Sequence, residues 1–134
     1  MIKTISLVVP ALVTIRGKNK YLNLNAYSNW HHIVRNNIKK KFSNIIYPQL
    51  SKLPKMAKIQ TISYTLITTS KRKRDRMNVY SIVDKFFCDA LQEQDIIKDD
   101  SDDFIENFIF TKTEYIKGKA NQLRVKIKIE YYEN

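Results

Sequence analysis

The pattern of hydrophobic and polar positions predicts β-strands in four segments of the chain. Residues 4–9 form a short apolar stretch, and residues 58–68 (KIQTISYTLIT) are rich in Ile, Thr and Tyr without a helical period. Residues 105–115 and 123–132 complete the set, and in the last segment apolar residues alternate with Arg124, Lys126, Lys128 and Glu130. One face of that strand should be buried, and the other should be exposed and mostly basic.

Two further segments have apolar residues at steps of three and four, which is the period of an α-helix. The first begins near Ser28, a suitable N-cap residue, and should end at Pro48 and Pro54. Its apolar positions are Trp30, Ile33, Val34, Ile38, Phe42 and Ile45. The second covers about residues 79–92 and carries the apolar stripe of a helix that lies on a sheet.

Together these elements predict an α+β fold in one domain, residues 1–134. We expect a single mixed or antiparallel sheet of about four strands with two main helices packed on it. The last two strands should form a hairpin joined through Lys117, Gly118 and Lys119, and the basic stretch at residues 16–21 should be irregular.

Composition excludes several classes of protein. Hydrophobic residues make up 43% of the chain, so it can form a folded core, and only 2 Gly are present, which excludes a glycine-rich phosphate loop. Cys88 is the single cysteine, so there is no internal disulfide, and an intracellular protein is expected. No apolar run approaches the roughly 20 residues of a membrane helix, so we expect no membrane association.

The charge balance is the first indication of a partner. The chain has 24 Lys and Arg against 13 Asp and Glu, a net charge of +11. Such an excess attracts polyanions, of which nucleic acid is the commonest. A basic structural or interaction protein that binds no nucleic acid is the alternative at this point.

A run of four cations, KRKR, lies between the expected strand and the second helix. Clustering these charges costs mutual repulsion that a phosphate backbone would relieve, although a solvated turn has the same composition. The residues expected to bind DNA are Lys71, Arg72, Lys73, Arg74 and Arg76, together with Lys39, Lys40 and Lys41 of the first helix.

Acidic residues stand next to this basic run and again after the second helix. Asp75 stands immediately after the basic run, at the expected strand end, and the later group is Asp99, Asp100, Asp102 and Asp103. Carboxylates from a strand end and a loop after a helix can meet at one edge of a sheet, and hard oxygen ligands without His or Cys are typical of Mg²⁺. Surrounded by cations, such a site indicates metal-assisted attack on a phosphodiester. The later group is also compatible with an acidic surface turn.

Three polar residues share one stripe of the second helix. Asn78, Lys85 and Asp89 stand at i, i+7 and i+11. Lys85 and Asp89 either form a surface salt bridge, or Lys85 points to the metal site and stabilises charge that develops on phosphate.

These motifs resemble those of the RusA-like Holliday junction resolvases of phages and prophages. The matching pattern is RD-x-x-N, then K-x-x-x-D-A-L on a helix, then DD. The segment LNLNAYSNWHH, the strand before KRKRD and the two closing strands also fit. The resemblance implies a homodimeric endodeoxyribonuclease that nicks branched DNA, such as a four-way junction, in recombination and repair. It further implies Mg²⁺ as cofactor, with Mn²⁺ as a substitute, no small-molecule cofactor, and action in the cytoplasm of a bacterial host cell.

Carried over residue by residue, the resemblance implies three catalytic residues: Asp75, Lys85 and Asp100. Asp75 and Asp100 would be metal ligands with Asp99 beside them, and Asn78 and Asp89 would support the site.

The chain departs from the family pattern in two places. Met77 stands where the family has a second aspartate, and a thioether does not replace a carboxylate on Mg²⁺. The segment between Asn78 and Lys85 is four residues longer than in the family pattern. Four residues are close to one helical turn, so both side chains stay on one face of the helix. The missing ligand would come from Asp84, Asp102, Asp103 or a water. The alternative is a protein that binds branched or single-stranded DNA without cleaving it efficiently.

Overall fold

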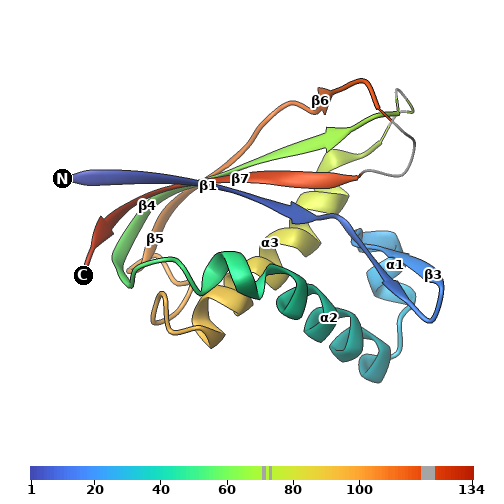
Figure 1. Ribbon diagram of the computed structural model, residues 1–134, viewed down its shortest axis with the longest axis horizontal. Helices are drawn as coiled ribbons and strands as arrows, with labels where there is room; N and C mark the ends of the chain where they lie inside the picture. Colours follow the sequence, from blue (N-terminus) through green and yellow to red (C-terminus); the bar gives the residue numbers. More distant parts are fainter. Residues whose placement is uncertain (71, 73, 119–122) are drawn as a thin grey trace.

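The computed structural model describes residues 1–70, 72, 74–118 and 123–134 (Figure 1). The main sheet has the strand order β1-β7-β4-β5, and β6 also pairs with β4. The bounds of these strands are β1 Ile2–Pro10, β4 Met56–Thr68, β5 Ile105–Phe110, β6 Glu114–Tyr115 and β7 Arg124–Glu133. β7 runs antiparallel to β1 and β4, whereas β5 and β6 run parallel to β4. The sheet is therefore mixed, and the predicted α+β class is confirmed.

Two main helices cover one side of this sheet, α2 (His32–Leu50) and α3 (Arg76–Glu93) (Figure 1). A short helix α1 (Leu24–Asn29) and a hairpin of β2 (Leu12–Ile15) and β3 (Lys18–Tyr21) lie at the end of the molecule opposite the two termini. None of the helices that the structure describes combines the length and apolar character needed to cross a membrane.

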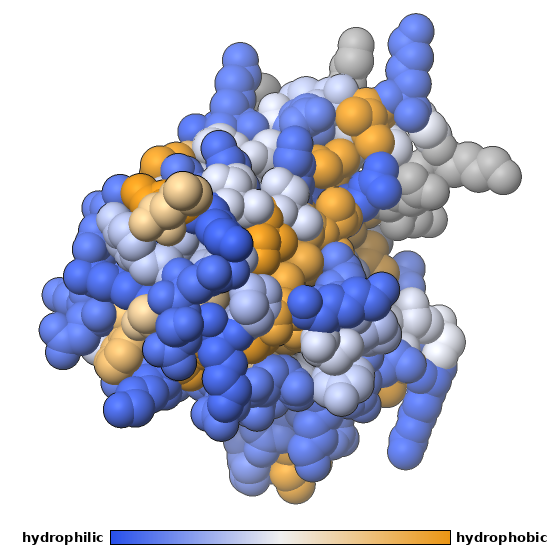
Figure 2. All heavy atoms as spheres, turned by 60° about the vertical axis from the view of Figure 1, so that its left-hand side comes forward, coloured by the Kyte–Doolittle hydropathy of each residue, from blue (hydrophilic) through white to orange (hydrophobic). Residues whose placement is uncertain are grey.

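The core lies between the sheet and the helices. The pairing register aligns rows of apolar side chains across three strands, for example Leu7, Ile127 and Tyr64. The predicted alternation in β7 is confirmed, because Ile127 is fully buried while Lys126 and Lys128 are exposed. On the side of the molecule that Figure 2 shows, hydrophilic residues cover most of the surface, and hydrophobic residues form a band between them and smaller separate patches.

The predicted closing hairpin is wrong, because β4 lies between β5 and β7. α3 connects β4 to a parallel β5, and β7 then pairs with both β1 and β4. An alternating pattern shows that a segment is a strand and which face is buried, but the choice of neighbour depends on contacts far away in the sequence. Of the expected connection, Lys119 lies outside the described residues.

The predicted start of the first helix is also wrong, because two helices replace one. Asn23 caps α1 and accepts a hydrogen bond from the Ala26 N–H at 2.8 Å. Ser28 lies inside α1, where its hydroxyl donates to the Leu24 carbonyl at 2.9 Å. α2 then begins after His31, whose Nδ1 accepts from the Ile33 N–H at 3.3 Å.

The buried stripe of α2 is displaced from the predicted one. Ile33 and Ile45 are exposed. The side chains that face the core are Ile38, Phe42, Ile46 and Leu50. Pro48 stands in the last turn and does not end the helix, which continues to Leu50. Trp30 is partly buried between α1 and α2, with its ring edge-on to Tyr27 at 6.1 Å between centroids.

The stretch predicted to be irregular, residues 16–21, contains a tight turn and strand β3. Arg16 and Gly17 form the two-residue turn between β2 and β3, with φ angles of 52° and 76°. Such turns match the twist of the strands when both central residues have positive φ, which Asn and Gly tolerate best. Because arginine occupies the first of these positions, the usual Asn-Gly signal of a hairpin was missing.

Candidate nucleic-acid interface

Asp75 begins α3 as its N-cap residue. Its Oδ1 accepts hydrogen bonds from the N–H groups of Met77 at 3.1 Å and Asn78 at 3.4 Å. These are two of the donors that a helix leaves without intrahelical partners, and the positive end of the helix dipole favours a carboxylate here. Both bonds use the same oxygen and Asp75 is exposed, so Oδ2 lies at the surface without either bond.

A surface pocket of about 370 Å³ surrounds this cap. Arg72, Arg74, Asp75, Asn78 and Val79 line it from the segment before α3 and from the first turn of the helix. Tyr21, Asn23 and Asn25 line it from the end of β3 and from α1. The pocket therefore joins the basic run to the Asn- and Tyr-rich segment, which the sequence separates by almost 50 residues.

The electrostatic character of this pocket suits an anion. The guanidinium groups of Arg72 and Arg74 are exposed, and guanidinium binds phosphate oxygens through two parallel hydrogen bonds. Arg76 is exposed at the start of α3 but does not line the pocket. The predictions for Lys71 and Lys73 lie outside the described residues.

Asp84 belongs to a different environment in the middle of α3. Its Oδ1 accepts hydrogen bonds from the Tyr64 hydroxyl of β4 and, at 3.3 Å, from the Cys88 thiol. Burial raises the pKa of Asp84 above its usual value, the two hydrogen bonds lower it, and the charge of Asp100 raises it. Burial likewise raises the pKa of Cys88 far above that of a free thiol. Sequence reasoning did not identify this cluster, because Tyr64 stands on another element.

The acidic residues after α3 do not gather into one group. Hydrogen bonds from Ser101, including its N–H at 2.7 Å, lower the pKa of Asp99. Burial and, to a smaller extent, the charge of Asp100 raise the pKa of Asp84. The pKa of Lys58 at the start of β4 is raised mainly by its hydrogen bond to Glu106 and to a smaller extent by the charge of Asp103. Among the described residues, no three His, Cys, Asp or Glu side chains are placed so that they could hold one metal ion.

Asp75 and Asp84 are also well separated along α3. Nine residues of helix correspond to about 14 Å of axial rise. The structure therefore places the N-terminal cap and the Asp84 cluster at different levels of the helix.

Asp89 binds a partner other than the one its spacing predicts. Its Oδ2 lies 2.9 Å from Nζ of Lys39, and Glu93 is 3.7 Å from the same nitrogen. Lys85 is exposed and forms no ion pair with any described residue. Lys39 therefore links α2 to α3, while Lys40 and Lys41 line a separate groove beside β3.

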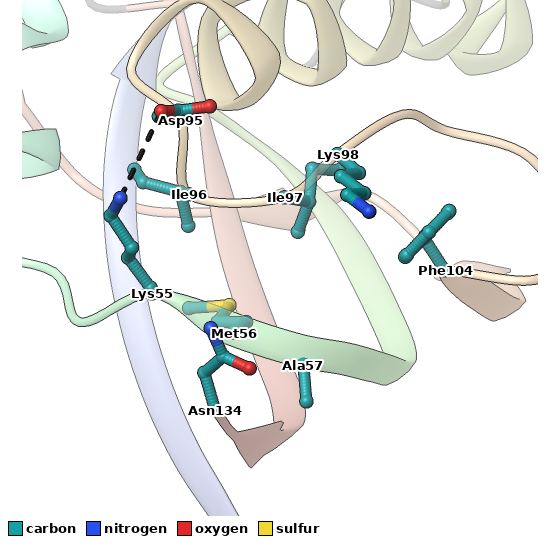
Figure 3. A pocket seen from close by; sticks show the side chains of 9 residues that line it. All are labelled: Lys55, Met56, Ala57, Asp95, Ile96, Ile97, Lys98, Phe104 and Asn134. Atoms are coloured by element: carbon teal, nitrogen blue, oxygen red, sulfur yellow. Dashed lines mark ion pairs between the residues drawn. The ribbon is translucent and has the colours of Figure 1, made fainter.

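A further pocket of about 380 Å³ lies near the C-terminus and the start of β4 (Figure 3). Lys55 and Asp95 form an ion pair of 3.8 Å across one side of it, and Ile96, Ile97 and Phe104 add apolar walls. None of the predicted site residues lines this pocket, so it does not belong to the interface.

No protein-family model matches the chain, and no curated protein sequence matches it.

Proposed function

We propose that this protein binds branched DNA at the N-terminus of α3 and cleaves it as a Mg²⁺-dependent endodeoxyribonuclease of the RusA-like type. The observation that carries the proposal is the pocket that Arg72, Arg74 and Asp75 line together. Metal-assisted hydrolysis needs a carboxylate to hold the metal ion and cations to bind the phosphodiester beside it.

Four residues of the pocket have a defined task in this proposal. The two arginines bind the phosphate oxygens and hold the backbone against the end of α3. The cap bonds fix the carboxylate of Asp75, so Oδ2 presents a hard oxygen ligand in a constant orientation. Tyr21, which is exposed at the edge of the pocket, offers a ring on which an unpaired base at a branch point can stack.

Asp75 supplies a single carboxylate to the pocket, so Mg²⁺ would take its remaining ligands from the substrate and from water. This ion is commonly held by one or two carboxylates together with substrate phosphates and waters. When bound, it supplies an activated water and neutralises charge on the phosphate. Asp75 would be the first protein ligand. Asp100 and Lys85 do not line the pocket and belong with Asp84 further along α3, so their proposed catalytic roles rest on the resemblance alone. A two-fold dimer is part of the proposal, since a four-way junction offers two strands for symmetric cleavage.

A nicking assay on a labelled four-way junction with Mg²⁺ or Mn²⁺ tests this proposal. The variants are Asp75→Asn and Asp100→Asn, with Asp95→Asn as the matched control, because Asp95 is also an exposed aspartate and lines a different pocket. Asparagine keeps the N-cap of α3, so the fold should be preserved. We expect symmetric nicks that Asp75→Asn and Asp100→Asn abolish and that the control retains. Junction binding without nicks in either metal contradicts the nuclease proposal.

The second candidate is a protein of the same fold that binds branched or single-stranded DNA without efficient cleavage. The observation in its favour is Met77, which is 46% exposed in the first turn of α3 and presents a thioether where the resolvases have a carboxylate. Met77→Asp separates the two candidates. Cleavage gained by this variant from an inactive wild type shows an incomplete site and supports the second candidate.

A further inference from the structure

A second basic surface lies on the other side of the hairpin from the Asp75 pocket. We call it the hairpin groove, an open groove of about 630 Å³ between the β2–β3 hairpin and α2. Its lining residues are Thr14, Ile15, Arg16, Lys18, Lys20, Val34, Asn37, Lys40, Lys41 and Asn44. Five of them are cations and none is acidic.

The periodicities of the two elements bring these side chains together. Asn37, Lys40, Lys41 and Asn44 stand at i, i+3, i+4 and i+7 and therefore share one face of α2. Lys18 and Lys20 are alternate residues of β3 and point to the same side of that strand. Tyr21, the next residue, lines the Asp75 pocket, so β3 forms a wall between the two sites.

The five cations of the hairpin groove have no acidic partner within the described part of the chain. Lys39 shows the contrast, because it is adjacent in sequence to Lys40 but binds Asp89 and Glu93. Bringing several unpaired cations into one groove is unfavourable without a counter-charge. A ligand with regularly spaced negative charges supplies that counter-charge.

Arg16 adds an independent observation. It has a φ of 52°, a conformation that costs an L-residue other than Asn or Gly roughly 1–2 kcal/mol. The turn would be more favourable with asparagine at this position, yet it carries a cation that lines the groove. Strain of this kind is typical of positions that serve a binding site.

The chemistry of the lining indicates a phosphodiester backbone as the ligand. Lysine and arginine contribute charge, Asn37 and Asn44 offer amide donors, and no aromatic ring is present for stacking on bases. The hairpin groove should therefore contact the backbone alone, whereas the exposed Tyr21 of the Asp75 pocket can also stack on a base.

We propose that the hairpin groove is a second DNA site that holds the phosphate backbone of one duplex arm while the branch point occupies the Asp75 pocket. This inference rests on the proposed function, which it extends by assigning a separate arm-binding site. In this arrangement, β3 lies between the bound duplex arm and the branch point of the DNA.

The test compares two triple variants with equal net charge. The groove variant is Lys18→Gln, Lys40→Gln and Lys41→Gln. The control is Lys52→Gln, Lys112→Gln and Lys126→Gln, three exposed lysines outside the groove that form no ion pair among the described residues. Anisotropy titrations of a labelled duplex and a labelled four-way junction between about 50 and 200 mM salt give the slope of log K against log salt.

We expect the groove variant to reduce the magnitude of this slope by about 3 for both DNAs, since each lost phosphate contact removes roughly 0.9. The control should keep the wild-type slope to within about 1. Equal slopes for the two variants would overturn the groove inference and leave the proposed function intact, provided that the wild type binds the junction. If the wild type binds neither the duplex nor the junction, both the groove inference and the proposed function are overturned.

Discussion

Nζ of Lys39 on α2 lies 2.9 Å from Oδ2 of Asp89 on α3. This contact between the two main helices uses a lysine that the sequence groups with two lysines expected to bind DNA, and an aspartate that the sequence groups with Lys85. Lys39 therefore has a structural role, whereas the neighbouring Lys40 and Lys41 line the hairpin groove.

Lys39→Gln should lower the free energy of unfolding by at most about 1 kcal/mol, because both partners are partly exposed. Hydrogen bonding to Asp89 raises the pKa of Lys39, so the pair stabilises the fold below the usual lysine pKa and ceases to do so as pH rises through the raised one. Urea denaturation at pH 7 measures the loss. DNA titration should show a smaller change in salt slope than Lys40→Gln, and an equal change contradicts the assignment.

Tyr64→Phe should destabilise the protein by about 1–3 kcal/mol at pH 7, because it leaves the half-buried carboxylate of Asp84 without its hydroxyl donor. Burial raises the pKa of Asp84, so the folded state binds its proton more tightly than the unfolded state does. The penalty of the buried charge is present above the raised pKa and disappears as pH falls toward the unfolded value of 3.8. Denaturation curves at pH 7 and pH 4 should therefore show a smaller effect of Tyr64→Phe at pH 4.

Asp84→Asn provides the companion measurement. The amide oxygen retains an acceptor for Tyr64 and carries no charge, so stability at pH 7 should equal or exceed that of the wild type. A loss of more than about 2 kcal/mol would show that the ionised carboxylate stabilises the fold.

Phe86→Ala should cost about 3–5 kcal/mol. The ring is 1% exposed and packs against Phe42 of α2 and Tyr27 of α1 at centroid distances of 5.9 and 6.2 Å, so three helices lose contacts at once. If the variant does not fold, Phe86→Leu replaces it with an expected loss of about 1 kcal/mol. Thermal and urea unfolding followed by circular dichroism give both values.

Arg16→Asn should raise stability and weaken DNA binding together. Asparagine tolerates the positive φ at this turn, so the free energy of unfolding should increase by about 1 kcal/mol. Removal of one groove cation should reduce the salt slope by about 0.9. Increased stability with unchanged DNA affinity would show that the arginine does not contact phosphate.

The affinity of the wild type for DNA should fall steeply between about 50 and 200 mM salt, because several cations at the two sites would displace counterions from phosphate. Anisotropy with a four-way junction measures this response. A weak and flat response instead supports the third interpretation of the sequence, a basic protein whose partner is not nucleic acid.

Local patterns in the sequence predicted the elements and their buried faces. The alternation in residues 123–132 defined which side of β7 is buried, and the apolar period placed Phe86 in the core, because both depend on residues only a few positions apart. The same patterns missed the Arg16 turn, since arginine is not a usual residue at positive φ, and extended the first helix across His31.

Tertiary structure alone decided which elements meet. β7 lies between β1 and β4, Tyr64 reaches Asp84, Lys39 binds Asp89, and β3 joins α2 to form the hairpin groove. Each of these relationships connects residues about 14 or more positions apart. Periodicity carries no information at that range, because the sheet order and the packing of the helices determine which distant side chains lie together.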